Sequence, residues 1–386
     1  AVVRSALKKL AEKYKKHKSD INLEFVNPDL DPARAKQDGI ENSGQLLIKL
    51  GDKSETVNSV DEQTMVNTLQ RLSREKPRLA VFVEGHDERS PLSDKSSGMS
   101  KLASVLERKG FRLQPHNILR TQSIPANTSF VIIAAPQKDY LDGEVSIISD
   151  YIKQGGNLLW LHEPGSLQGL DNIEQQLGLE LNEGTLLDAN QALQEMLGIK
   201  HPAAIAIIDY GQSELTKDLS AHTLFPFATA VARDEAIKDV DWKYQPLLTT
   251  LPTSWLESGE IQGNVKFDDE ADKPGPLDIG MALTRELKKP EAEDQKSAEQ
   301  RIVVIADSDF MLNSYIGQGS NLELASNIFN WLSADDDLLS IKATVAPGTT
   351  LNLSSAGRIG LASLWLVLPA GLLLIGVLRW VKRRKR

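Results

Sequence analysis

Apolar residues recur with two different periods over the first 76 residues of the chain. Helical spacing over residues 3–17 predicts a helix, and alternation over residues 21–28 predicts a strand that ends in Asn-Pro. A short helix over 33–40, a hairpin over 44–60 turned at Gly51-Asp52, and a helix over 62–76 follow. We therefore expect residues 1–76 to form a small α/β domain.

Buried-type apolar runs alternate with amphipathic helices from Pro77 onward, which predicts right-handed crossovers and a parallel sheet. The expected domain covers residues 77–340, and its polar, acidic stretch at about 212–300 predicts an irregular insertion. The expected strands are 78–85, 111–118, 128–136, 157–165, 203–211 and 301–311, and the expected helices are 100–109, 142–154 and 321–332.

The last part of the chain carries 20 residues without a charge, from 359 to 378. A helix of that length spans about 30 Å, the thickness of the hydrocarbon core of a bilayer. We predict a linker over 341–357, a transmembrane helix over 358–381 and a basic cytoplasmic tail over 382–386; a buried core helix followed by a solvated tail is the alternative. The residues expected to anchor this helix are Arg358 and Arg379 at its ends, Trp365 and Trp380 at the interfaces, and Pro369 as a tolerated kink.

The net charge of −9 over 386 residues divides unevenly at Arg358. The first 357 residues hold 37 basic and 53 acidic side chains, a net charge of −16, and the remainder carries +7. By the positive-inside rule, the basic C-terminus lies in the cytoplasm and the acidic body lies outside it. An acidic body argues against nucleic acid as a partner, because phosphates would be repelled.

Two absences in the sequence narrow the chemistry. The chain has no cysteine, which excludes thiol nucleophiles, disulfides and cysteine-ligated metals. It also has no P-loop or Gly-rich nucleotide motif, so we expect any ATP hydrolysis to occur on another subunit.

Polar side chains gather where three of the predicted strands end. In parallel sheets such ends share one edge and form the usual site crevice. A catalytic interpretation makes a histidine the base beside Glu88 or Asp307, and a metal interpretation joins His86, Glu88 and Asp307 as ligands. The alternative is that these side chains only hold loop backbones, and we assign no catalytic residue, cofactor or metal ligand. The candidate crevice residues are His86, Glu88, His162, Asp307 and Asp309.

The order of elements in residues 1–76 looks like a thioredoxin-type domain without its first strand. That missing strand would precede residue 1, so we expect the chain to be part of a longer protein. The domain has no Cys-x-x-Cys motif, which excludes redox chemistry of the thioredoxin type.

Four segments in order resemble the auxiliary proteins of gliding-motility-type ABC transporters, the GldG-like family. They are VFVEGHDERS at 81–90, the run at 130–164, the run at 304–333, and the closing apolar span with its arginine-rich end; residues 24–40 also look like the N-terminal half of the family. One departure is Asp87, where the family pattern has Gly, which questions a turn that needs positive φ.

The resemblance implies a membrane-anchored, non-enzymatic accessory subunit in the bacterial inner membrane, with a second, N-terminal span, a separate permease and a cytoplasmic ATPase. It also implies that residues 77–340 are similar to the flavodoxin-like scaffold of class I glutamine amidotransferases, without the nucleophilic cysteine. The expected ligand of the body is an extracytoplasmic protein or glycan. Two alternatives remain: an extracytoplasmic hydrolase or carbohydrate-processing enzyme that uses the His/Glu/Asp crevice, and a structural anchor for motility or the envelope.

Overall fold

The computed structural model describes residues 2–16, 18, 20–27, 30–38, 40, 44–58, 62–73, 78–217, 219–259, 261, 265–287 and 298–333. The linker, membrane helix and tail predicted after residue 340 lie outside the described residues, as do all five predicted anchor residues. None of the helices in the described ranges has both the length and the apolar character needed to cross a membrane.

The N-terminal segment contains the predicted helices and hairpin but not the predicted strand. Its elements are α1 (Val2–Lys15), α2 (Pro32–Gln37), β1 (Leu46–Leu50), β2 (Lys53–Val57) and α3 (Glu62–Ser73). Ile48, Val57 and Leu72 form a small core between the hairpin and α3. The strand predicted over 21–28 is wrong for the described residues 21–27, which belong to no sheet, since the β1–β2 sheet has only two strands.

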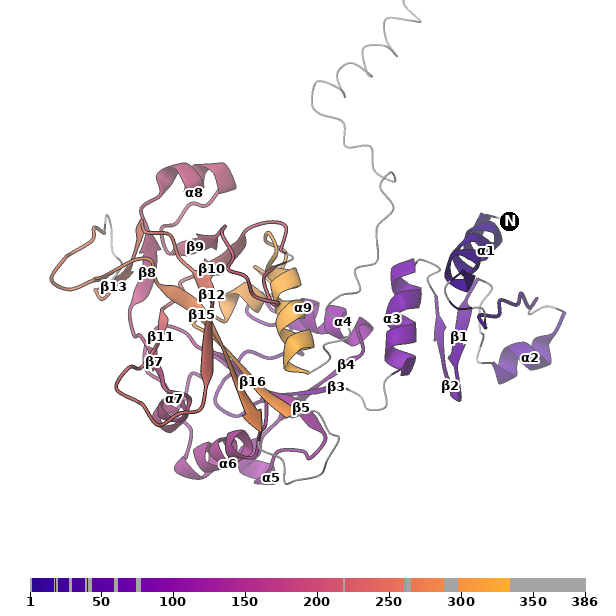
Figure 1. Ribbon diagram of the computed structural model, residues 1–386, viewed down its shortest axis with the longest axis horizontal. Coiled ribbons are helices and arrows are strands. Elements are labelled where there is room, and N and C mark those ends of the chain that lie inside the picture. Colours follow the sequence, from indigo (N-terminus) through magenta and orange to yellow (C-terminus); the bar gives the residue numbers. More distant parts are fainter. Residues whose placement is uncertain are drawn as a thin grey trace, which may run out of the picture. The chain divides into compact units, whose positions relative to one another are not determined.

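A seven-stranded mixed sheet forms the centre of the following domain (Figure 1). Five parallel strands adjoin one another in the order β16, β6, β5, β3, β4, and β15 and β12 continue the sheet antiparallel beyond β16. The parallel sheet predicted from the sequence is therefore confirmed in part, with a mixed edge. The bounds are β3 (Arg78–Val83), β4 (Phe111–His116), β5 (Thr128–Ala134), β6 (Leu158–Leu161), β12 (Lys243–Thr249), β15 (Asp278–Leu287) and β16 (Ala298–Ile305).

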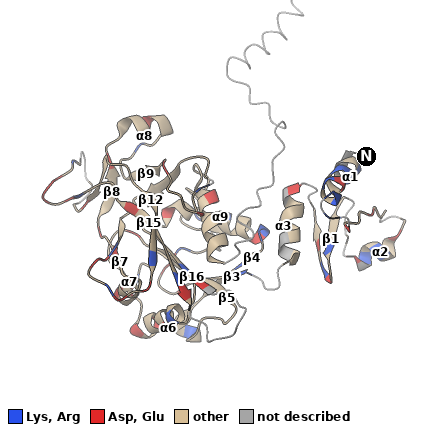
Figure 2. Cartoon of the chain, viewed as in Figure 1, with Lys and Arg blue, Asp and Glu red and all other residues tan. Residues whose placement is uncertain are grey.

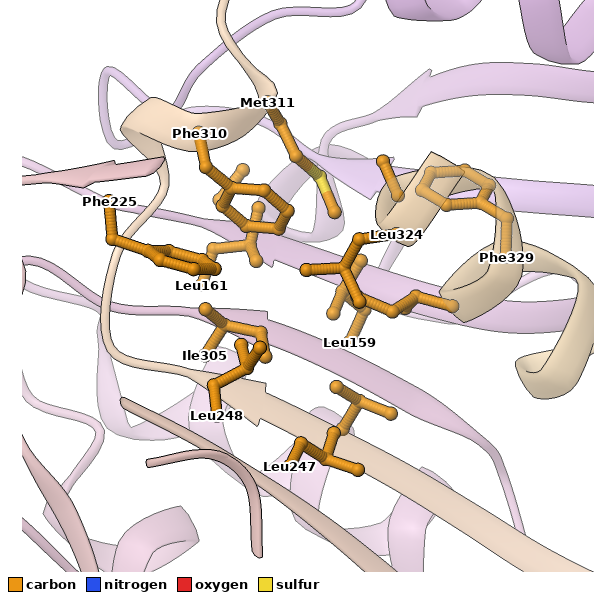
Figure 3. Close-up of a cluster of buried hydrophobic side chains, with 14 of the residues drawn as sticks. Leu159, Leu161, Phe225, Leu247, Leu248, Ile305, Phe310, Met311, Leu324 and Phe329 are labelled. Carbon is orange, nitrogen blue, oxygen red and sulfur yellow. The ribbon is translucent and has the colours of Figure 1, made fainter. Parts of the chain in front are cut away.

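Helices cover both faces of this sheet, which is why its central strands are apolar without interruption. Along β3, Ala80 and Phe82 belong to one core and Leu79, Val81 and Val83 to the other, as the alternation of side chains in a strand requires. The first core includes α4 (Ser100–Arg108) and α9 (Asn321–Leu332), and part of it is drawn in Figure 3. The second core includes α5 (Ile118–Thr121), α6 (Asp142–Lys153) and α7 (Asp171–Leu177).

The described part of the stretch predicted as an irregular insertion, about 212–300, contains strands of four sheets with turns and loops between them. Its strands alternate apolar and polar residues or are short, and such strands carry a weaker signal than continuous apolar runs. The strand predicted over 203–211 exists as β9 (Ala204–Ile207), but it pairs antiparallel with β10 rather than joining the central sheet. The other elements are β7 (Leu179–Leu181), β8 (Thr185–Asp188), α8 (Gln191–Leu197), β10 (Thr223–Pro226), β11 (Val231–Arg233), β13 (Ser254–Glu257), β14 (Lys273–Pro274) and the 3-10 turn η1 (Asp309–Met311).

Charged residues of both signs are interspersed over the helices and strands of the described chain (Figure 2). The central strands β3, β5 and β6 are fully buried except for the first two residues of β5. Polar chemistry is therefore concentrated in the loops at the strand ends.

Candidate functional site

The loop after β3 folds inward around His86, which is 7% exposed. The Nδ1 atom of His86 lies 3.1 Å from Glu88 Oε1, and its Nε2 atom lies 3.1 Å from Glu144 Oε2 at the start of α6. The Tyr140 ring stacks on the imidazole at 3.9 Å, and its hydroxyl donates to Glu88 Oε1 at 2.7 Å. Both ring nitrogens of His86 are thus occupied by carboxylates of the protein itself.

A second buried network joins the loops after β6 and β16. Glu163 Oε1 accepts hydrogen bonds from the Ser308 amide, at 2.9 Å, and from the Ser308 hydroxyl. Asp307 is fully buried; its Oδ1 accepts from the Asp309 amide, whereas its Oδ2 has no partner. Arg89 Nη2 donates to Asp309 Oδ1 at 3.3 Å and so connects this network to the loop after β3.

Burial dominates the electrostatics of this acidic network. It raises the pKa of Glu163 to about 7, helped by the charge of Asp309 and opposed by the hydrogen bonds from Ser308. Burial, followed by the charges of Glu163 and Asp309, raises the pKa of Asp307 well above its usual range. Burial also raises the pKa of Asp309, and Arg89 opposes that effect. Burial therefore shifts all three carboxyls of the network toward their protonated forms.

His162, at the end of β6, is only 4% exposed, and its Nε2 atom has no hydrogen-bond partner. Burial lowers its pKa from 6.5 to about 4, so its imidazole is neutral at neutral pH. Its nearest aromatic neighbour is Trp160, with ring centroids 6.2 Å apart. These surroundings are those of a buried core histidine.

An open cleft of about 240 Å³ lies beside these networks, between the loop after β3 and the segment that links β4 to α5. Of the five residues predicted for the crevice, only Glu88 lines it. The lining residues are Phe82, Val83, Glu84, Gly85, Asp87, Glu88, Arg89, Ser90, Pro91, Pro115, Asn117 and Arg120.

The structure brings the predicted crevice residues together in two groups rather than one. His86 contacts Glu88, and Asp307 contacts Asp309, but no hydrogen bond or ion pair joins Asp307 to His86 or Glu88. His162 makes no polar side-chain contact with any of the other four among the described residues. In the described ranges no group of three or more His, Asp or Glu side chains is arranged to hold a metal ion.

Three residues of these networks were not singled out from the sequence, namely Tyr140, Glu144 and Glu163. Glu144 occupies the third position of α6, where its carboxylate also accepts from the Leu141 amide at 3.1 Å, so a sequence shows it as an ordinary helix-capping residue. Glu163 directly follows His162 at the end of a predicted strand, and this position was a usable signal.

The turn after β3 keeps its backbone conformation although Asp replaces the Gly of the family pattern. Asp87 has φ +59°, in the left-handed region that Asp tolerates better than most residues. Its carboxylate forms an ion pair with Lys138 at 2.8 Å. The backbone at Asp87 therefore adopts positive φ even though the residue is not glycine.

His86, Glu88 and His162 are poorly placed to act as a general base in this arrangement. A general base needs a nitrogen or oxygen within hydrogen-bond reach of a substrate proton. The ring nitrogens of His86 and the carboxylate of Glu88 are satisfied internally, and His162 is covered. What the site presents outward is the cleft.

No curated protein matches the chain. Among solved structures, the chain is similar to the N-terminal domain of mmIFT52, at 12% identity and a TM-score of 0.46, over 66% of this chain and 97% of that one. A putative ThuA-like protein from Bacteroides uniformis matches at 12% identity and a TM-score of 0.38, over 67% and 93%. An exo-beta-1,4-mannosidase from an Opitutaceae bacterium matches at 11% identity and a TM-score of 0.33, over 69% and 37%. We draw no functional argument from likenesses at these TM-scores.

A family comparison covers more than half of the chain. Residues 76–340 match the family described as an ABC-type uncharacterized transport system. This match begins one residue before the domain predicted from the sequence, which covers residues 77–340. The GldG-like auxiliary proteins, whose motifs the sequence resembles, are members of this family. The chain therefore belongs to the ABC-type transport system auxiliary family.

Proposed function

We propose that this chain is a membrane-anchored, non-enzymatic accessory subunit of an ABC-type transport complex. Its α/β body lies outside the cytoplasm and binds a partner or substrate. A separate permease carries out the transport, and a cytoplasmic ATPase hydrolyses ATP. The observation that carries the proposal is the family match over residues 76–340. The uncharged run at 359–378, closed by basic residues, supports the anchor and its orientation.

The geometry of the strand ends supports a binding role over a catalytic one. His86 and Glu88 hold the loop after β3 in place, and the outer side of that loop lines the open cleft. A fold alone never establishes an activity, and here the side chains of His86 and Glu88 are engaged in hydrogen bonds within the protein. The body is therefore suited to present a rigid recognition surface.

Affinity capture of the full chain from its native membrane tests the complex. We expect the permease and the ATPase encoded beside it to co-purify in fixed ratio, and deletion of residues 359–386 to abolish their recovery while the body stays folded. Purification without either subunit, from membranes that contain both, would show that the chain is not part of such a complex.

The absence of cysteine makes the topology directly measurable. Met196, on α8, is 72% exposed, and Lys385 lies in the predicted tail. In intact cells, a membrane-impermeant maleimide should label a Met196→Cys variant and should label a Lys385→Cys variant only after the membrane is permeabilised. Labelling of both, or of the tail alone, would contradict the proposed orientation.

A further inference from the structure

The cleft beside the loop after β3 is small but has the features of a ligand site. Its volume is about 240 Å³, just below the range of about 300–1,000 Å³ typical of pockets for drug-sized ligands. The walls come from two segments, residues 82–91 and 115–120, at neighbouring strands of the sheet. A small molecule, or one end of a longer one, matches this size.

Most charged groups of the cleft are already paired. The Glu88 carboxylate is 2% exposed and binds His86 and Tyr140, and Arg89 is bonded to Asp309. Asp87, as described above, forms an ion pair at the surface. Each of these three side chains therefore has a polar partner outside the cleft, although the Nε atom of Arg89 has none.

Two opposite charges in the cleft are not paired. Glu84 comes from the end of β3 and Arg120 from α5, both are exposed, and both line the cleft. Neither side chain makes a hydrogen bond or ion pair with any described residue, including the other. Asn117 holds the backbone of Arg120, because its Oδ1 accepts from the Arg120 amide at 3.0 Å. The cleft thus offers one carboxylate and one guanidinium on separate walls.

Pro91 and Pro115 add rigid walls to the cleft. A ligand that satisfies these features carries an anionic group and a cationic group.

We propose that this cleft binds a small zwitterion such as an amino acid, with its carboxylate at Arg120 and its ammonium group at Glu84. A guanidinium binds a carboxylate through paired N–H donors, and a carboxylate accepts the hydrogen bonds of an ammonium group. This proposal rests on the binding role proposed above and names the ligand class.

Isothermal titration of the full chain in detergent with three related probes tests the assignment. L-leucine carries both charges, N-acetyl-L-leucine lacks the ammonium group, and L-leucinamide lacks the carboxylate. We expect L-leucine to bind about threefold to tenfold more tightly than either analogue, the range for a charged hydrogen bond in a partly open site. D-glucose, a neutral polyol, should not compete.

Two variants and one control assign the charges to their residues. Arg120→Gln should weaken the binding of L-leucine until its affinity equals that of L-leucinamide. Glu84→Gln should weaken it until its affinity equals that of N-acetyl-L-leucine. Arg112→Gln, exposed on β4 and outside the cleft, should leave all affinities unchanged. All three positions are exposed, so circular dichroism should show an unchanged fold.

The proposal is overturned if L-leucine shows no saturable binding, if neither cleft variant changes its affinity, or if D-glucose binds in its place. The titration uses the chain alone, without permease or ATPase. Its failure would therefore leave the outcome of the membrane capture experiment unaffected, and failure of the capture would not explain a negative titration.

Discussion

Replacing Glu163 by Gln should stabilise the protein above neutral pH and have little effect in acid. Burial holds the pKa of this carboxyl at about 7 in the folded state, against an ordinary value of 4.5 in the unfolded chain. Below about pH 4.5 the group is protonated in both states and contributes nothing. As pH rises from 4.5 to 7, only the unfolded chain releases the proton, so the free energy of unfolding falls.

The size of this effect follows from the difference between the two pKa values. Each unit of difference is worth about 1.4 kcal/mol, so the loss reaches at most about 3 kcal/mol above pH 7. Solvent screening of this half-buried side chain makes that figure an upper bound. Gln keeps an oxygen that can accept from Ser308, and it removes the repulsion from Asp309 and Asp307. Glu163→Gln should therefore raise the free energy of unfolding by up to about 3 kcal/mol at about pH 8.

Urea unfolding followed by tryptophan fluorescence, at several values between about pH 4.5 and 8, measures this dependence. Glu235→Gln is the matched control, because Glu235 is 81% exposed and its loss should change stability by less than about 0.5 kcal/mol at any pH. A difference between Glu163→Gln and wild type that stays constant with pH, or a destabilised variant at about pH 8, would refute the reasoning.

Four further substitutions test neighbouring parts of the structure. Burial lowers the pKa of His162 to about 4, so as pH falls below about 6.5 this histidine is protonated first in the unfolded chain, and the free energy of unfolding falls. His162→Phe removes this effect and should lessen the loss of stability between about pH 6.5 and 4 by up to about 3 kcal/mol, measured by urea unfolding. Gly85→Ala should destabilise the protein by about 1–3 kcal/mol in thermal unfolding, because Gly85 has φ +135° and an added Cβ would lie 2.9 Å from Asn117 Nδ2. Gly143→Ala, on α6 with open space around it, should instead stabilise the protein by about 0.5–1 kcal/mol. Tyr140→Phe leaves a buried carboxylate without one donor and should cost about 1–3 kcal/mol, measured as a lower denaturation midpoint.

The sequence predicts the parallel part of the sheet well, because that part depends on local signals. Continuous apolar runs such as 128–134, each followed by an amphipathic helix, report burial on both faces directly. The antiparallel strand β15, which lies between β12 and β16, was missed although its middle residues are apolar, because polar stretches of the sequence flank it and predicted an insertion. The segment at 21–27 shows the opposite error, since alternation predicts a strand there but does not supply a neighbouring strand for it to join.

The candidate site was predictable only to the level of which loops meet. The strand ends do place Glu88, His162 and Asp307 at one edge of the sheet, as the topology requires. Which side chains touch depends on rotamers and on helix starts far away in the chain. Glu144 lies 58 residues from His86, and nothing in the local sequence pairs the two.

The loop after β3 is held by the buried networks on its inner side and lines the open cleft on its outer side. On its inner side, His86 is bonded to α6 and Arg89 to η1, which fixes residues 84–91 against two separate elements. On its outer side, the same residues line the cleft. Residues 84–91 are therefore already ordered before a ligand binds, which lowers the entropic cost of binding. It follows that substitutions at His86 should weaken ligand binding by loosening these residues, even though His86 is not among the residues that line the cleft.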